Sequence, residues 1–195
     1  VEKELKTIEW DAEAAEKAGY EHFMMKEIHE QPKAVQDTLH SVLKDGQIDL
    51  ADIGLTEEEM TGFSQIYIVA CGSAYHVGMA MQYVLEDLAQ IPVRVELASE
   101  FRYRRMRLDQ KGLVIAISQS GETADTLAAL RLAQKEGLTT LAIVNVVGSS
   151  IAREANKIFY TLAGPEISVA TTKAYSTQLI AGYCLAVQFA KVRGT

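Results

Sequence analysis

The segment Leu113–Thr126 reads LVIAISQSGETADT and combines the signals of a strand, a turn and a helix start. An apolar run gives way to Ser118-Gln119-Ser120-Gly121, and leucines at helical spacing follow from Glu122 onward. Three hydroxyls, on Ser118, Ser120 and Thr123, are expected where the first unpaired backbone N–H groups of the helix point. Because a helix N-terminus carries about half a positive charge, the pattern predicts a phosphate site.

A simpler interpretation is that Ser120 only caps the helix, as Ser or Thr commonly does. A cap needs one hydroxyl, whereas this turn supplies three together with Gln119. Gly121 would also let the backbone approach a ligand closely. A short Ser/Gly turn is nevertheless a weak motif, so the segment alone leaves both interpretations open.

The chain has 195 residues, 48% of them hydrophobic, and a formal net charge of −7. This length suits one domain with an additional arm. The acidic balance argues against a nucleic-acid partner, and the arginine-rich run 102–107 is expected to be a solvated or subunit-facing helix end. Cys71 and Cys184 stand far apart, so no disulfide, no metal site and no cofactor is expected.

The sequence also bears on location. No basic and apolar leader is evident, and the longest apolar stretch, 179–190, is too short to span a bilayer. A cytoplasmic protein without membrane contact is therefore expected. The chain begins on Val1 rather than Met, which suggests a segment of a longer parent.

Residues 1–45 form a polar and aromatic arm that differs in character from the rest, so residues 46–195 are expected to form the main domain. Within the arm, apolar residues recur at helical spacing from Pro32 to Leu43, which predicts an amphipathic helix ended by Gly46. Before it, the segment 23–28, with its two methionines, resembles a docking segment.

From Gln65 onward, short apolar runs alternate with helical segments. Strands are expected in 65–72, 93–97, 113–118, 139–146 and 157–163, with helical pieces that include 101–106 and a long final helix from Thr171. This order predicts an α/β fold, a three-layer α-β-α arrangement around a five-stranded parallel sheet. In a flavodoxin-like 2-1-3-4-5 order, the first and third strands end side by side, so Cys71-Gly72-Ser73 and 118–121 would face one crevice.

Common nucleotide and hydrolase signatures are missing from this region. There is no G-x-G-x-x-G after the first strand, no G-x-x-x-x-G-K-[ST] and no G-x-S-x-G, and His76 is the sole histidine of the α/β part. The ligand class that remains as a candidate is a small phosphorylated molecule that is not a nucleotide.

Four segments together resemble the sugar isomerase (SIS) domain. They are ACGSAYHVG at 70–78, ASEFRYR at 98–104, SQSGETADT at 118–126 and ISVATTKAYSTQ at 167–178. With the EWD and KAGYEHFMMKEIHEQP of the arm, the chain is similar to the first of the two SIS domains of glucosamine-6-phosphate synthases, the glutamine:fructose-6-phosphate aminotransferases. The resemblance implies a flavodoxin-like SIS fold, a homodimer, and a parent chain with a glutaminase domain and a second SIS domain.

The resemblance also implies roles for single residues. Family members convert fructose 6-phosphate and glutamine to glucosamine 6-phosphate and glutamate. By correspondence, Ser118, Gln119, Ser120 and Thr123 would hold the phosphate, Cys71, Gly72 and Ser73 would line the sugar, and Val169, Ala170 and Thr171 would close the other side. Two departures from the family pattern are Ser73-Ala74 in place of Thr-Ser and Thr171 in place of Ser.

No catalytic residue is assigned within this chain, because the family's acid–base groups come from the second SIS domain or a neighbouring subunit. The isolated chain is therefore expected to be inactive. Glu122, the one carboxylate near the strand ends, is explained as a partner of the helix dipole. Two alternatives stay open: a non-catalytic SIS module that senses sugar phosphates, which would be expected to carry a basic DNA-binding segment, and a stand-alone phosphosugar isomerase, which would need an acid–base pair.

Overall fold

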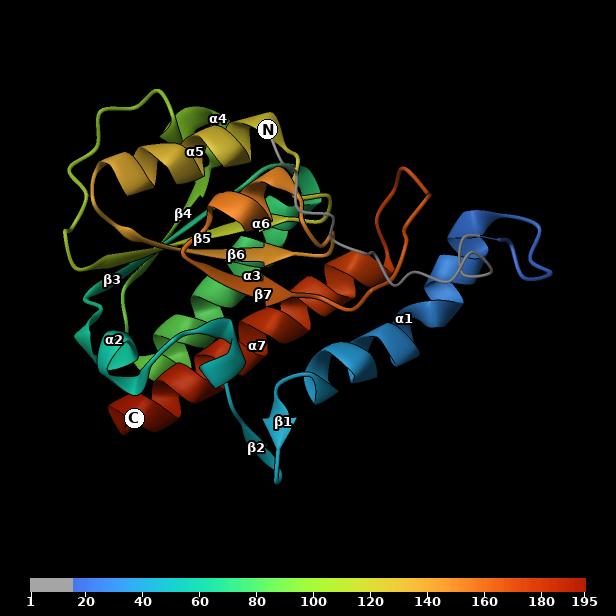
Figure 1. Ribbon diagram of the computed structural model, residues 1–195, viewed down its shortest axis with the longest axis horizontal. Coiled ribbons are helices and arrows are strands. Elements are labelled where there is room, and N and C mark those ends of the chain that lie inside the picture. The colour runs from blue at the N-terminus through green and yellow to red at the C-terminus, as the bar shows by residue number, and fades with distance from the viewer. Residues whose placement is uncertain (1–15) are drawn as a thin grey trace, which may run out of the picture.

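The computed structural model describes residues 16–195, and Figure 1 shows a sheet between two layers of helices. The elements in chain order are α1 (Phe23–His40), β1 (Leu43–Lys44), β2 (Gln47–Ile48), the short 3-10 helix η2 (Ala51–Ile53), α2 (Glu57–Gly62), β3 (Gln65–Ala70), α3 (Gly72–Ala89), β4 (Val93–Leu97), α4 (Ala98–Phe101), β5 (Gly112–Ser118), α5 (Ala124–Lys135), β6 (Thr139–Val144), α6 (Ser150–Glu154), β7 (Lys157–Tyr160) and α7 (Lys173–Arg193). The EWD segment of the arm lies outside the described residues.

The main sheet has five parallel strands in the order β4-β3-β5-β6-β7, which confirms the predicted topology. Ala70, the last residue of β3, is in register with Leu97 of β4 on one side and Ile117 of β5 on the other. The chain therefore crosses from one side of β3 to the other between β4 and β5. This reversal brings the carboxyl ends of β3 and β5 together at one edge of the sheet.

Alternate residues of the strands face two separate cores, because side chains along a strand point to opposite faces. One core packs α3 and α7 against Ile66, Ile68, Leu113 and Ile115. The other packs α4, α5 and α6 against Tyr67, Val69, Val114 and Ala116. Every residue of β5 is buried, which explains its unbroken apolar run.

Helix α1 lies outside this sandwich, alongside α7 (Figure 1). The prediction that the arm helix starts at Pro32 is wrong, since α1 begins at Phe23 and carries Pro32 in its interior. Proline removes the N–H that would bond to the carbonyl four residues earlier. Here Gln31 Nε2 donates to that carbonyl, on Ile28, at 3.1 Å, so the lost bond is replaced by a side chain. The division of the chain at residue 46 stays a prediction.

The end of the arm helix was also predicted wrongly. The helix stops at His40, and β1 and β2 form an antiparallel hairpin whose two-residue turn is Asp45-Gly46, both with positive φ. Asp-Gly is a strong signal for this turn, and Gly46 serves it rather than a helix end. The predicted helix over 101–106 lies earlier, at Ala98–Phe101, and residues 102–111 lead without a further helix or strand to β5.

None of the helices within residues 16–195 is long and apolar enough to cross a membrane. Within the same residues, no group of three or more His, Cys, Asp or Glu side chains is placed to hold a metal ion.

Candidate functional site

A pocket of about 250 Å³ lies at the carboxyl ends of β3 and β5. Three stretches line it, from the start of α3, from the turn between β5 and α5, and from the loop before α7. The lining residues are Cys71, Ser73, Ala74, Ile117, Ser118, Gln119, Ser120, Thr123, Glu166, Ser168, Val169, Thr171 and Gln178. Eight of the ten residues assigned by resemblance are among them, whereas Gly72 and Ala170 are not.

Hydroxyls organise the turn between β5 and α5. Ser118 Oγ lies 2.9 Å from Thr123 Oγ1 and accepts the Gly121 N–H at 3.0 Å, while Ser120 Oγ accepts the Glu122 N–H at 3.2 Å. Helix α5 starts at Ala124, two residues later than Glu122, and its N-cap Thr123 makes no side-chain cap bond. The interpretation of Ser120 as the helix cap is therefore wrong, and the first N–H groups of α5 are left without a side-chain cap.

Gly121 meets two constraints set by the fold. Its φ is +66°, and a Cβ at this position would overlap the side chain of Ser149. The Gly121 carbonyl also accepts the N–H of Ile151 at 3.0 Å. The segment that starts α6 therefore lies close against this glycine, and a close approach of the same backbone to a ligand stays a prediction.

The second side of the pocket comes from the end of β3. Cys71 occupies the N-cap position of α3 without a side-chain cap bond, and its half-buried thiol lies 3.9 Å from Thr126 Oγ1. Ser73 and Ala74 follow on the first turn of the helix. Gly72 instead provides the bend, with φ of +58°. Residues at the starts of two helices, α3 and α5, therefore converge on one pocket.

The third side is the pocket loop, residues 161–172, which has no helix or strand. Val169 is fully exposed at its tip. Thr171 Oγ1 donates to Glu166 Oε2 at 2.9 Å, so the hydroxyl that replaces the family's serine is engaged within the loop. Glu166 Oε1 accepts the N–H groups of Thr172 and Ala174 at 2.9 and 3.2 Å, which caps the start of α7.

Sequence reasoning missed three polar residues of the lining, Glu166, Ser168 and Gln178. Glu166 and Ser168 flank the assigned residues in the loop that follows β7 at the same edge of the sheet. Gln178 is buried on a helix that is apolar nearly all round. A polar residue in the middle of such an apolar helix was the signal that could have indicated its role.

Among the described residues that line the pocket, Glu166 carries the one charged side chain. Among the described residues that line it, none is lysine or arginine, so an anion there would be held by N–H groups and hydroxyls. Glu122 does not reach the pocket. Hydrogen bonds from the Ser150 hydroxyl and backbone N–H lower the pKa of Glu122, and the backbone bond measures 2.7 Å to Oε1.

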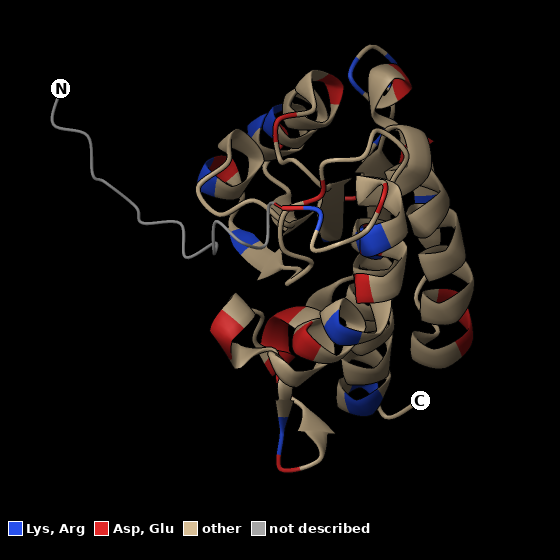
Figure 2. Ribbon diagram, turned by 90° about the vertical axis from the view of Figure 1, so that its right-hand side faces the viewer, with Lys and Arg blue, Asp and Glu red and all other residues tan. Residues whose placement is uncertain are grey.

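Two of the four arginines in the arginine-rich run are paired with carboxylates. Arg102 pairs with Asp125 at 2.6 Å, and Arg104 pairs with Glu96 at 2.9 Å. Figure 2 shows Lys and Arg residues scattered among Asp and Glu residues on the side of the molecule that it presents.

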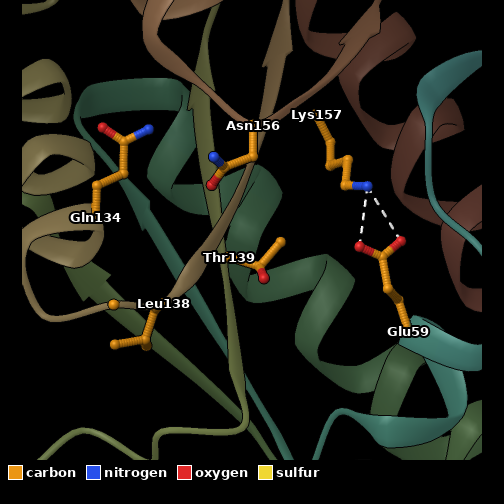
Figure 3. A pocket seen from close by; sticks show the side chains of 7 residues that line it. Glu59, Gln134, Leu138, Thr139, Asn156 and Lys157 are labelled. Carbon is orange, nitrogen blue, oxygen red and sulfur yellow. Dashed lines mark hydrogen bonds and ion pairs between the residues drawn. The ribbon is translucent and has the colours of Figure 1, made fainter.

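A larger hollow, about 520 Å³, lies at the opposite edge, where β6 and β7 begin (Figure 3). Its charges satisfy each other, since Lys157 Nζ lies 2.9 Å from Glu59 Oε1. Burial raises the pKa of Glu59, but bonds from the Thr56 N–H and Lys157 outweigh it and lower the pKa overall. Open parallel sheets bind ligands at the carboxyl ends of their strands, so the smaller pocket is the candidate site.

Comparisons with known proteins agree with the family that the sequence motifs indicate. The model of the SIS domain family matches residues 59–188. Glutamine–fructose-6-phosphate aminotransferases (isomerizing) from Clostridium acetobutylicum and Clostridium tetani are 59% and 57% identical, and each match covers 100% of this chain and 32% of the relative. The C-terminal domain of glucosamine-fructose-6-phosphate aminotransferase from Francisella tularensis superposes with a TM-score of 0.87 at 44% identity, over 92% of this chain and 50% of that one. The chain thus spans about a third of the length of these curated relatives.

Proposed function

Because the chain belongs to the SIS domain family, we propose that its pocket binds fructose 6-phosphate as part of an aminotransferase that makes glucosamine 6-phosphate. The observation that carries the proposal is the meeting of two helix starts and three hydroxyls at the reversal point of the sheet. Among residues 16–195, neither lysine nor arginine lines this pocket. The relatives' names supply the sugar and the reaction. They also favour this function over that of a sugar-phosphate sensor.

The phosphate would bind at the turn between β5 and α5. Ser118, Gln119, Ser120 and Thr123 line the pocket there, and the uncapped N–H groups of α5 add positive potential. The sugar would extend toward Cys71 and Ser73 at the start of α3, with the pocket loop on its other side. This part of the enzyme would act by positioning its substrate.

Catalytic acid–base groups would come from elsewhere in the assembly. The carboxylate in the pocket, Glu166, accepts bonds from Thr171, Thr172 and Ala174, which occupies its oxygens with structural partners. The isolated chain is therefore proposed to bind sugar phosphate without converting it. A stand-alone isomerase would need a second group to pair with Glu166.

The wider setting belongs to the same proposal. A glutaminase domain and a second SIS domain would complete the parent enzyme, which would act as a homodimer in the cytoplasm. The exposed Met24, Met25 and Ile28 on α1 support a contact with a further domain or subunit. The free thiols of Cys71 and Cys184 suit a reducing compartment.

Calorimetric titration of the 195-residue chain with inorganic phosphate and fructose 6-phosphate tests the proposal. Replacing Thr123 by Val keeps the side-chain volume and removes one hydrogen bond to a charged ligand. We expect both ligands to bind about tenfold to a hundredfold more weakly, a loss of roughly 1.5–3 kcal/mol.

Thr123→Ser is the matched control, because it keeps the hydroxyl and should bind phosphate nearly as wild type does. Cys71→Ser should also leave inorganic phosphate binding almost unchanged, since Cys71 is assigned to the sugar. Thermal unfolding of each variant checks the fold. Equal phosphate affinity in wild type and Thr123→Val would show that the turn does not bind the phosphate.

A further inference from the structure

The pocket loop, residues 161–172, depends on the arm helix for its shape. Glu27 of α1 accepts the N–H groups of Ile167 and Ser168 on the same oxygen, Oε1, at 2.7 and 3.1 Å. These two residues directly precede Val169, and Ser168 itself lines the pocket. In Figure 1 the loop after β7 stands beside the first turns of α1. A residue more than 130 positions away in sequence therefore holds the wall of the pocket.

Further bonds from α1 hold the start of the loop and the helix that follows it. Thr38 Oγ1 accepts the Leu162 N–H at 3.0 Å. On α7, just after the loop, the buried Lys173 Nζ lies 2.7 Å from Glu30 Oε2, and Ser176 Oγ donates to Gln31 at 2.6 Å. Within this set of bonds, those of Glu27 are the ones that reach the pocket wall.

Stability alone does not explain a carboxylate at position 27. Glu27 is only 2% exposed, and its Oε2 has no hydrogen-bond partner among the described residues. Burying a carboxylate costs free energy, and an apolar residue could serve the packing of α1 on α7 without that cost. What an apolar residue could not provide is an acceptor for the two loop N–H groups.

We propose that Glu27 is a positioning residue for the sugar end of the pocket. This inference rests on the proposed function, in which the loop closes over the sugar while the turn at 118–123 holds the phosphate. Glu27 touches no ligand itself. By fixing the backbone at Ile167 and Ser168, it makes the arm helix a structural part of the sugar site, and it leaves the phosphate turn unaffected because that turn belongs to other elements.

The test compares two ligands on the 195-residue chain by calorimetry. Inorganic phosphate probes the turn alone, and fructose 6-phosphate probes the turn and the sugar wall together. Glu27→Met keeps the length of the side chain and removes both acceptors. We expect fructose 6-phosphate to bind about tenfold more weakly, while the affinity for inorganic phosphate stays within about twofold of wild type.

Three further variants sharpen the result. Glu27→Gln keeps an amide oxygen at this position and should restore most of the fructose 6-phosphate affinity. Glu27→Asp withdraws the acceptor by one methylene and should weaken sugar binding even if the methionine variant fails to fold. Asp37→Asn on the same helix, which loses only an exposed pair with Lys33, should behave as wild type.

The outcomes separate this inference from the proposed function. If wild type binds fructose 6-phosphate no better than inorganic phosphate, the sugar site itself is refuted. If wild type prefers the sugar phosphate and both Glu27→Met and Glu27→Asp keep that preference, the inference is overturned and the proposed function stands. A parallel loss of affinity for both ligands would also overturn it, since that pattern indicates general damage to the pocket.

Discussion

At Gly121 the backbone has a φ of +66°, and Ser149 packs against the place where a side chain would begin. Gly148 has a similar φ, +73°, but nothing lies near its missing Cβ. The two glycines therefore separate the cost of backbone strain from the cost of steric overlap. They also show why the geometry of the turn at 118–123 depends on the start of α6.

Gly148→Ala should lower the free energy of unfolding by about 1–2 kcal/mol through backbone strain alone. Gly121→Ala should cause the same loss from backbone strain and a further loss of about 1–3 kcal/mol, because its methyl group would be overpacked against Ser149. Urea unfolding of both variants measures the difference. Equal losses would show that Ser149 moves aside without cost.

The two cysteines should differ in reactivity. Burial raises the pKa of the Cys184 thiol to about 11, so its thiolate is scarce at pH 8. Cys71 is half-buried and lines the pocket. A thiol reagent at pH 8 should modify Cys71 first, and fructose 6-phosphate should slow that reaction. Mass spectrometry identifies the modified residue, and earlier labelling of Cys184 would contradict the burial of α7.

Residues of the site were predictable to the extent that they lay in short, contiguous motifs. The hydroxyls at 118, 120 and 123 follow a buried strand, so their position at its carboxyl end could be inferred. The packing of Ser149 against Gly121 joins segments 28 residues apart and left no local signal. Glu166 was missed for another reason, because its partners lie only five to eight residues away but in a loop without helical or strand periodicity.

At the scale of elements, α3 and α7 pack so closely that Gly182 of α7 lies directly against Met81 of α3. A Cβ on Gly182 would overlap the fully buried Met81 side chain. By contrast, Gly62 at the end of α2 has free space around its missing Cβ. Both residues are helical, so substitution by alanine should destabilise the protein at Gly182, where space is lacking, and stabilise it at Gly62, where space is free.

We expect Gly182→Ala to lower the free energy of unfolding by about 1–3 kcal/mol, because the core has no room for the methyl group. Gly62→Ala should raise it by about 0.4–1 kcal/mol, because alanine restricts the unfolded chain. Chemical denaturation measures both. A stabilising Gly182→Ala would mean that α3 and α7 are less tightly packed than described.

Elements were predictable where periodicity was unambiguous. Most strands of the sheet are short apolar runs, whereas β4 alternates apolar and charged residues, and all five were located. The arm helix was misplaced because Pro32 is a strong local break, and its compensation by Gln31 is visible only in three dimensions. The Asp45-Gly46 hairpin carried a readable signal that was attributed to a helix end instead.

At the scale of the whole molecule, the proposed function depends on where the ligand binds. The smaller pocket at the carboxyl ends of β3 and β5 and the larger hollow at the start of β6 and β7 lie at opposite edges of the sheet. The topology favours the first, because the sheet reverses its winding there. The parallel sheet was predictable from the alternation of strands and helices, the order of its strands came from the likeness to flavodoxin-like folds, and the size of the second hollow was not predictable.

Mapping amide chemical shifts of the 195-residue chain during titration with fructose 6-phosphate tests this claim most directly. We expect the largest changes at residues 71–74, 118–126 and 166–171, and we expect inorganic phosphate to reproduce only those at 118–126. Changes centred on Gln134, Thr139, Asn156 and Lys157 would place the ligand in the other hollow and contradict the account.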